Sequence, residues 1–137
     1  MSGLFSKLER EVLPLVSKPG RYVGGERNVS TKDVDDAELT FLLAFPDVYE
    51  IGMSHLGLQV LYDILNRREE IAAERVFAPW TDMEALLREK GLPLFSLESR
   101  KPARGFDVVG FTLQYELHAP TVLAMLVGPV VLPFLLL

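Results

Sequence analysis

The sequence predicts an α/β fold with a mostly parallel sheet and flanking helices, and three features indicate this class. The nearly continuous apolar segment Leu39–Phe45 is typical of a strand that is buried on both faces of a sheet. A polar loop follows this segment, and apolar residues then recur at the three-to-four-residue spacing of a helix. A further strand and a helix with clear end signals repeat the arrangement later in the chain.

The first part of the chain, residues 1–38, is expected to form a helix and an extended arm in front of the sheet. Within residues 1–17, apolar side chains share one stripe that the charged side chains avoid. The stripe contains Leu4, Phe5, Leu8, Val12 and Leu13. Residues 18–38 contain Pro19-Gly20 and Gly24-Gly25, which interrupt regular structure.

The segment after the first strand predicts a helix that packs on the sheet through one apolar side. The positions expected to face the sheet are Leu56, Val60, Leu61, Ile64 and Leu65. The charged cluster 67–70 marks the end of this helix.

A second strand and helix are predicted between residues 75 and 93. A short strand near Arg75–Ala78 leads into a turn at Pro79-Trp80, where the tryptophan either walls a pocket or packs against the start of the helix. Thr81 and Glu84 have the spacing of a capping box at a helix amino terminus. Gly91 can adopt the left-handed conformation that ends helices, and a proline follows two residues later.

Two more strands, Leu94–Leu97 and Val108–Leu113, complete the predicted sheet, with a loop at Arg100–Gly105. The order β-α-β-α-β-β indicates a Rossmann-like or flavodoxin-like α/β domain over residues 39–117.

The last segment, residues 118–137, is an apolar tail, because no Asp, Glu, Lys or Arg follows Glu116. A truncated or frame-shifted end explains this composition best, and a segment that packs on an absent partner is the alternative. A membrane anchor is disfavoured because Gly128, Pro129 and Pro133 interrupt the apolar run.

Composition excludes several classes of function and of binding site. A net charge of −5 gives no reason to expect nucleic-acid binding. The absence of cysteine excludes disulfides, thiolate metal sites, a cysteine nucleophile and a cysteine-ligated iron–sulfur cluster within this chain. Two histidines are too few for a histidine-rich metal site. The charged amino terminus lacks the apolar core of a secretory signal, so we expect a cytoplasmic protein.

The loop after the first strand is the candidate binding site, because α/β sheets bind ligands at the carboxyl ends of their strands. Its candidate residues are Asp47, Tyr49, Glu50, Gly52, Ser54, His55 and Gly57. In the ligand-binding interpretation, the two glycines let the backbone approach a ligand and Ser54 caps the following helix. The alternative is a capped helix with a solvated loop.

The strand near residue 111 should end beside this loop if the sheet is parallel. Thr112, Gln114 and Glu116 alternate with apolar residues and would therefore share one face. They either line a ligand crevice or form the solvated face of an edge strand. The sequence contains neither a dinucleotide-binding nor a phosphate-binding glycine motif, and no serine hydrolase elbow. We assign no catalytic residue and no metal ligand.

The chain contains five distinctive segments, which are KPGRYVGGE (Lys18–Glu26), FPDVYEIGMSHLGLQVLYDILN (Phe45–Asn66), ERVFAPWTDME (Glu74–Glu84), LPLFSLES (Leu92–Ser99) and FDVVGFTLQYEL (Phe106–Leu117). These segments resemble the amino-terminal region of a family of large radical SAM proteins, in which a cobalamin-binding-type domain precedes the radical SAM barrel. The similarity covers about residues 12–117 and fades at His118.

The resemblance implies an accessory domain without catalysis of its own. The CxxxCxxC motif of the radical SAM cluster is absent, so the iron–sulfur cluster and S-adenosylmethionine are expected in a separate catalytic domain, the implied partner. Cobalamin or a substrate is the ligand that the resemblance implies for the crevice. Met53 and Leu58 replace the Asp and Gly of the cobalamin motif DxHxxG around His55. The alternative function is an interaction or scaffold domain that packs on the barrel with an empty crevice.

Overall fold

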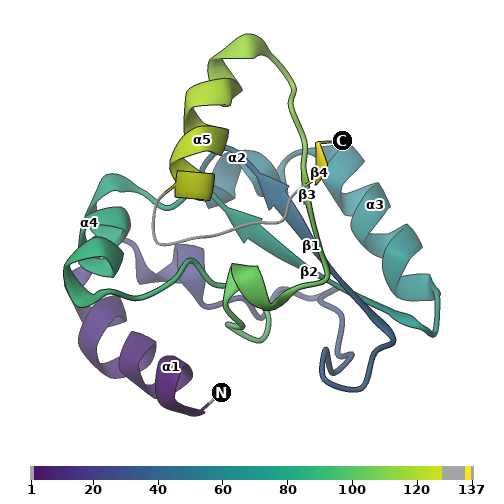
Figure 1. Ribbon diagram of the computed structural model, residues 1–137, viewed down its shortest axis with the longest axis horizontal. Helices are drawn as coiled ribbons and strands as arrows, with labels where there is room; N and C mark the ends of the chain where they lie inside the picture. Colours follow the sequence, from purple (N-terminus) through teal and green to yellow (C-terminus); the bar gives the residue numbers. More distant parts are fainter. Residues whose placement is uncertain (1, 128–134, 137) are drawn as a thin grey trace.

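The computed structural model describes residues 2–127 and 135–136, and these form a four-stranded parallel sheet flanked by helices (Figure 1). The strand order is β2-β1-β3-β4. The strands are β1 (Leu39–Phe45), β2 (Ile71–Phe77), β3 (Val108–Phe111) and β4 (Leu135–Leu136). All neighbouring strands run parallel, which confirms the predicted α/β class.

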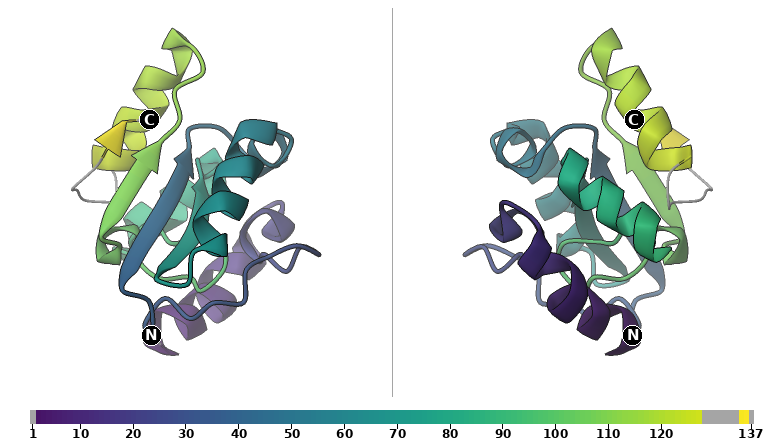
Figure 2. Two further views of the ribbon diagram at one scale, coloured as in Figure 1. Left: turned by 90° about the vertical axis from the view of Figure 1, so that its right-hand side faces the viewer. Right: turned by 90° about the vertical axis from the view of Figure 1, so that its left-hand side faces the viewer.

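The helices cover both faces of the sheet. On one face lies α3 (Leu56–Arg67), and on the other lie α1 (Ser2–Lys7) and α4 (Thr81–Lys90) (Figures 1 and 2). The short helix α2 (Tyr49–Met53) follows β1 directly, and α5 (Ala119–Val127) follows the loop after β3. The loops at the carboxyl ends of β1 and β3 therefore meet at one edge of the sheet.

Two apolar cores lie on opposite faces of the sheet. The core beneath α3 contains Leu43, Phe45, Leu58, Tyr62, Ala73, Phe77 and Leu97. The larger core on the other face joins the amino-terminal helical segment, α4, α5 and the alternate residues of β1 and β3, including Leu42, Ala44, Val109 and Phe111. Because successive strand residues point to opposite faces, β1 contributes to both cores, as its apolar sequence predicted.

The amino-terminal segment is helical, as predicted, although its geometry changes along its length. After α1, a π-helical segment spans Leu8–Val12 and a 3₁₀ turn spans Leu13–Leu15. Leu8 and Val12 are fully buried against the sheet-facing core. The arm that follows contains one 3₁₀ turn, Pro19–Tyr22, and is otherwise irregular.

Helix α3 occurs where the sequence predicted it, but of the residues expected to face the sheet only Leu61 and Leu65 pack against the core beneath it. Leu58 and Tyr62 are buried, whereas Leu56, Val60 and Ile64 are 75%, 46% and 52% exposed. Apolar residues occupy more than one side of this helix, and the sequence alone does not show which side packs. The prediction that Leu56, Val60 and Ile64 face the sheet is therefore wrong.

The predicted strand Leu94–Leu97 is also wrong. This segment forms one isolated antiparallel bridge, Phe95 with Pro102, within a compact loop. Its backbone bonds to that loop and to the outer edge of β2, for example from Leu97 N to Arg75 O at 2.8 Å. The segment is apolar because the loop is buried, and burial alone gives the same local pattern as a strand.

Helix α4 begins and ends where expected, but without the predicted capping box. Trp80 is the N-cap residue and makes no side-chain cap hydrogen bond. The Glu84 carboxylate instead pairs with Arg88 at 2.8 Å. Asp82 accepts hydrogen bonds from the backbone N–H and hydroxyl of Ser17, both at 2.8 Å. Gly91, with φ of 62°, ends the helix as predicted.

The carboxyl-terminal segment contains α5, whose Val122 and Met125 are buried in the larger core. The strand β4 then pairs with β3 through Gly110↔Leu135 and Phe111↔Leu136. The predicted aberrant tail also includes residues 128–134 and 137, which lie outside the described residues. The described residues contain no helix with the length and hydrophobicity of a transmembrane span.

Candidate functional site

The segment after β1 forms helix α2, and its glycine serves packing. A Cβ atom at Gly52 would lie 2.2 Å from Cε1 of Phe77 and 3.2 Å from Cδ1 of Phe45. Glycine at this position therefore lets α2 lie directly on the aromatic side chains at the ends of β1 and β2. The close approach expected toward a ligand is instead an approach to the core.

Tyr49 and Glu50 of α2 bind the amino-terminal arm. The Tyr49 hydroxyl donates to Glu26 Oε1 at 2.7 Å, and burial together with this carboxylate raises the pKa of Tyr49 to about 12. The Glu50 carboxylate accepts from Arg21 Nε at 2.9 Å. Its own backbone N–H and the Arg21 guanidinium hold the pKa of Glu50 below its ordinary value. Both side chains thus have partners within the protein.

His55, and not Ser54, caps helix α3. The Nδ1 atom of His55 accepts the backbone N–H of Leu58 at 3.1 Å, whereas the Ser54 hydroxyl donates to Glu50 O at 2.9 Å. The predicted capping role of Ser54 is therefore wrong. A Cβ atom at Gly57 would lie 2.8 Å from Cε1 of His55, so this glycine makes room for the imidazole. The ring lies beside Phe45, with centroids 5.1 Å apart.

The segment after β3 approaches the same phenylalanine from another side. β3 ends at Phe111, so the predicted common face of Thr112, Gln114 and Glu116 does not form. Thr112 is buried and Gln114 is exposed. The backbone N–H of Thr112 still donates to Ala44 O at 3.2 Å, which extends the contact with β1 by one residue.

His118 is the residue at this edge that the sequence did not indicate. The residue is 4% exposed, and its ring meets that of Phe45 edge-on, with centroids 5.8 Å apart. Its Nε2 atom lies 3.7 Å from Oδ2 of Asp47. A single histidine in an apolar segment carries no local signal, because only the tertiary fold brings it to the end of β1.

Four polar residues therefore follow β1 and β3 at the carboxyl ends of these strands, and the two histidines among them contact Phe45. They are Asp47, His55, Thr112 and His118. The strand order β2-β1-β3-β4 reverses between β1 and β3, which makes this edge the topological switch point where open α/β sheets bind ligands. Of the predicted site residues, Tyr49, Glu50, Gly52 and Ser54 contact other parts of the protein.

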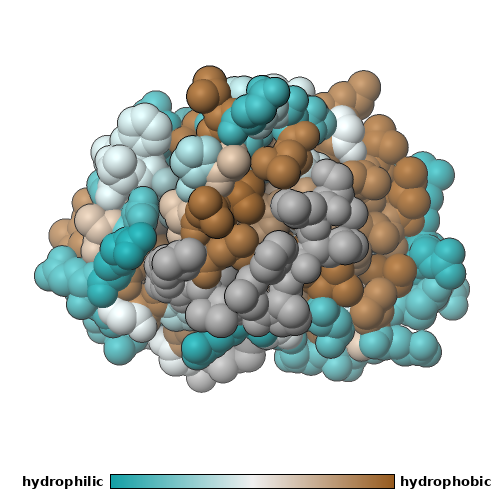
Figure 3. All heavy atoms as spheres, turned by 45° about the horizontal axis from the view of Figure 1, so that its top comes forward, coloured by the Kyte–Doolittle hydropathy of each residue, from teal (hydrophilic) through white to brown (hydrophobic). Residues whose placement is uncertain are grey.

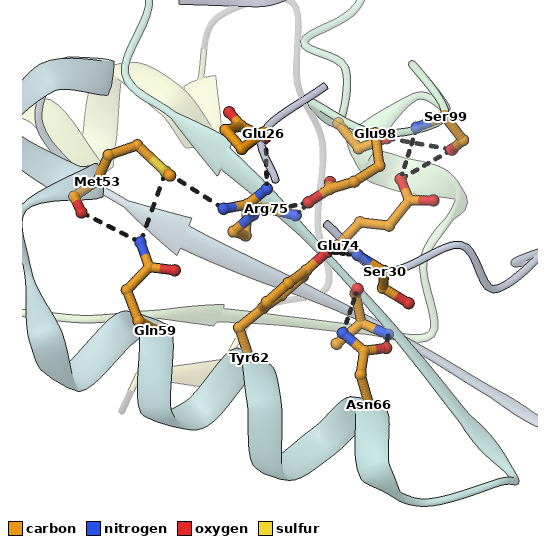
Figure 4. Close-up of polar contacts among 12 residues, drawn as sticks. Glu26, Ser30, Met53, Gln59, Tyr62, Asn66, Glu74, Arg75, Glu98 and Ser99 are labelled. Atoms are coloured by element: carbon orange, nitrogen blue, oxygen red, sulfur yellow. Dashed lines mark hydrogen bonds and ion pairs between the residues drawn. The ribbon is translucent and has the colours of Figure 1, made fainter. Parts of the chain in front are cut away.

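A second polar cluster lies beneath α3, on the outer strand β2 (Figure 4). Arg75 is 2% exposed, and its Nε atom donates to Glu98 Oε1 at 2.7 Å. Its NH2 group contacts Glu26 Oε2 at 3.1 Å, and the guanidinium lies 4.3 Å from the centre of the Tyr62 ring. Burial alone would lower the pKa of Arg75, but the nearby carboxylates outweigh this effect, so the pKa is raised overall.

This second cluster also seals the free edge of β2. The Asn66 side chain accepts from Ala73 N at 2.9 Å and donates to Ala73 O at 3.0 Å. Glu98 Oε2 accepts from Arg75 N at 2.9 Å. Unpaired strand edges invite association with other strands, and these side chains prevent it. The cluster is structural, because its buried charges are paired within the protein.

The donors present do not fit a histidine-ligated cobalamin. In that arrangement a carboxylate orients the histidine, but Nδ1 of His55 accepts a backbone N–H and Met53 occupies the position of the motif's Asp. The carboxylate at this edge, Asp47, faces His118 instead. In the described residues, no group of three or more His, Asp or Glu side chains is arranged to hold a metal ion.

A family model for the amino-terminal region of radical SAM proteins matches residues 57–131, which is more than half of the chain. The chain belongs to this family. The matched span extends from α3 to beyond α5, so the expectation that the similarity ends at His118 is wrong. It includes Thr112 and His118, while Asp47 and His55 precede it. No curated protein and no solved structure matches the chain.

Proposed function

We propose that this chain is an accessory module of a radical SAM protein, without catalysis of its own, that binds a small molecule at the carboxyl ends of β1 and β3. The family match over residues 57–131 is the observation that carries the proposal. The chain has no cysteine to ligate the radical SAM cluster, so cluster and S-adenosylmethionine belong to a catalytic barrel, the proposed partner.

The ligand proposed for the crevice is cobalamin or the substrate of that barrel. The polar residues at the β1–β3 switch point support this location. Because His55 caps α3 without an orienting carboxylate, we propose that a corrinoid would be held through its periphery and not through a protein ligand to cobalt.

An absorbance titration of the purified chain with hydroxocobalamin, followed by gel filtration, tests the ligand. We expect the chain to retain corrinoid, and His55→Ala to retain it equally. No retained corrinoid at high micromolar concentrations would remove cobalamin from the proposal. Loss of retention in His55→Ala alone would show that the imidazole ligates cobalt after all.

Exposed apolar side chains at the same edge favour a second function, an interaction domain that docks on the catalytic barrel. Figure 3, which looks obliquely onto this end of the molecule, shows apolar side chains at the surface. Large exposed apolar groups commonly mark interaction surfaces. In α2, in α3 and in the loop after β3 they are Ile51 (52%), Leu56 (75%), Leu113 (40%), Tyr115 (49%) and Leu117 (77%).

Co-expression with the catalytic region of the same protein tests the docking function. Replacing Leu56 and Leu117 together by serine should reduce co-purification by at least about tenfold, since burial of each leucine contributes about 1.5–3 kcal/mol. Leu15→Ser is the control, because Leu15 is 63% exposed in the amino-terminal segment, away from this edge. Equal losses in both variants would contradict docking through the carboxyl ends.

A further inference from the structure

Two buried side-chain atoms in the described part of the chain have no hydrogen-bond partner, Thr112 Oγ1 and His118 Nε2. Both belong to the segment that follows β3. Buried polar groups in proteins are nearly always satisfied by protein, water or ligand, so each exception requires an explanation. Finding both exceptions in one short segment points to a common cause.

Both side chains are directed to the face of the sheet that holds Phe45, as follows from these contacts. Val109 and Phe111 point into the core beneath α4 and α5, so the alternation of strand residues directs Thr112 to the opposite face. Phe45 belongs to the core on that face, and His118 contacts its ring. Thr112 also continues the pairing of β3 with β1 through Ala44 O.

The hydrogen-bonding roles of His118 follow from its neighbours. The backbone N–H of Gln114 points at Nδ1 from 3.5 Å, which assigns Nδ1 as the acceptor and places the proton of the neutral ring on Nε2. That N–H group faces Asp47 Oδ2 at 3.7 Å, which is too long for a hydrogen bond. The His118 donor and the Asp47 acceptor thus face each other without forming a hydrogen bond.

We propose that Asp47, Thr112 and His118 form a binding site for a neutral group that both donates and accepts hydrogen bonds, an alcohol hydroxyl or a primary carboxamide. The oxygen of such a group accepts from His118 Nε2–H, its own proton is donated to the Asp47 carboxylate, and the Thr112 hydroxyl completes the set. This inference rests on the proposed function and specifies the chemistry of its ligand.

Charged groups fit this set less well. An anion would face the Asp47 carboxylate, and an ammonium group could not accept the proton of His118. Asp47 connects the site to solvent, because its side chain is 26% exposed while that of His118 is 5% exposed. The Tyr115 ring lies against the His118 ring, with centroids 4.1 Å apart.

Equilibrium dialysis of the full chain against two probes tests the inference and separates the two sources. Dicyanocobinamide presents carboxamides, and adenosine presents ribose hydroxyls. We expect one probe to bind, and Thr112→Val and His118→Gln each to weaken its binding by about tenfold, the loss of one hydrogen bond. Asp47→Ala removes the acceptor and should weaken binding by a similar factor. Thr31→Val, at an exposed position of the arm, is the control and should leave binding unchanged.

Binding of the cobinamide alone identifies a carboxamide site, and binding of adenosine alone identifies a hydroxyl site. If neither probe binds, or if Thr112→Val and His118→Gln bind as tightly as the wild type, the inference is wrong. Co-purification with the catalytic region is measured independently of these probes. A chain that co-purifies but binds neither probe would therefore overturn this inference and leave the accessory function standing.

Discussion

Among the described residues, polar side chains are hydrogen-bonded to each other at the amino end of the β1–β3 pair but not at its carboxyl end. At the amino end, Thr40 Oγ1 and N donate to Asp107 Oδ2, both at 2.8 Å, and Thr40 Oγ1 accepts from Asp107 N at 3.0 Å. At the carboxyl end, Thr112 Oγ1 has no partner within the described residues, and Asp47 and His118 stand 3.7 Å apart. The same residue types therefore form a closed pair at one end and an incomplete set at the other.

This difference separates structural polar groups from candidate binding groups. The Thr40–Asp107 pair and the Arg75 cluster satisfy their members internally, so no ligand is needed to explain them. The set around His118 is incomplete within the described residues, and the proposed ligand would complete it. Three experiments test whether the two kinds of polar group differ as described.

The largest effect on stability is expected at the Arg75 cluster, whose buried charged groups are paired within the protein. Arg75→Met removes the partner of the buried Glu98 carboxylate and should reduce the free energy of unfolding by about 3–5 kcal/mol, measured by urea denaturation. The double variant Arg75→Met/Glu98→Gln should recover about 1 kcal/mol or more, because it removes the unpaired charge. A single variant as stable as the wild type would show that the cluster is not structural.

An intermediate effect is expected from replacing each buried threonine by valine. Thr40 and Thr112 are similarly buried, 5% and 7% exposed. Thr40→Val breaks two hydrogen bonds with Asp107 and should cost about 1–3 kcal/mol in chemical unfolding. Thr112→Val removes a hydroxyl without a partner and should change stability by less than about 0.5 kcal/mol. Equal losses would mean that Thr112 is satisfied within the free protein.

The smallest effect is expected for the dependence of stability on acidic pH. Hydrogen bonds from the backbone N–H and the hydroxyl of Thr40 hold the pKa of Asp107 below its ordinary value. A lowered folded-state pKa contributes stability above the unfolded value of about 3.9, and this contribution is lost as the pH falls through the folded value. Urea midpoints should thus fall more between about pH 4 and pH 2 in the wild type than in Asp107→Asn. Parallel curves would indicate no such coupling.

Local sequence patterns predicted strands and helices correctly where a pattern is compatible with only one type of secondary structure. The strand Leu39–Phe45 was predicted with its observed ends, and Gly91 marks the end of α4. Leu94–Leu97 was wrongly predicted as a strand, because a buried loop and a buried strand have the same apolar composition. The side of α3 that faces the sheet was predicted only in part, since Leu61 and Leu65 pack on the core whereas Leu56, Val60 and Ile64 are exposed.

The candidate site was predicted only in part for the same reason. Asp47, His55 and Thr112 were expected at the carboxyl edge and lie there. The roles of Ser54 and Gly52 differ from the prediction, because a cap and a packing contact depend on neighbours that spacing does not reveal. That these residues bind a ligand is still a prediction.

The α/β class, the mostly parallel sheet and the absence of cysteine ligands could be predicted from the sequence, because apolar periodicity and composition are local properties of the chain. Which polar groups are satisfied depends on contacts between distant segments, and these are known only from the folded structure. His118 lies far from Asp47 along the chain, and nothing in its neighbourhood indicates a partner. The two meet because β3 pairs with β1, so that the segments after both strands are brought to the same edge of the sheet.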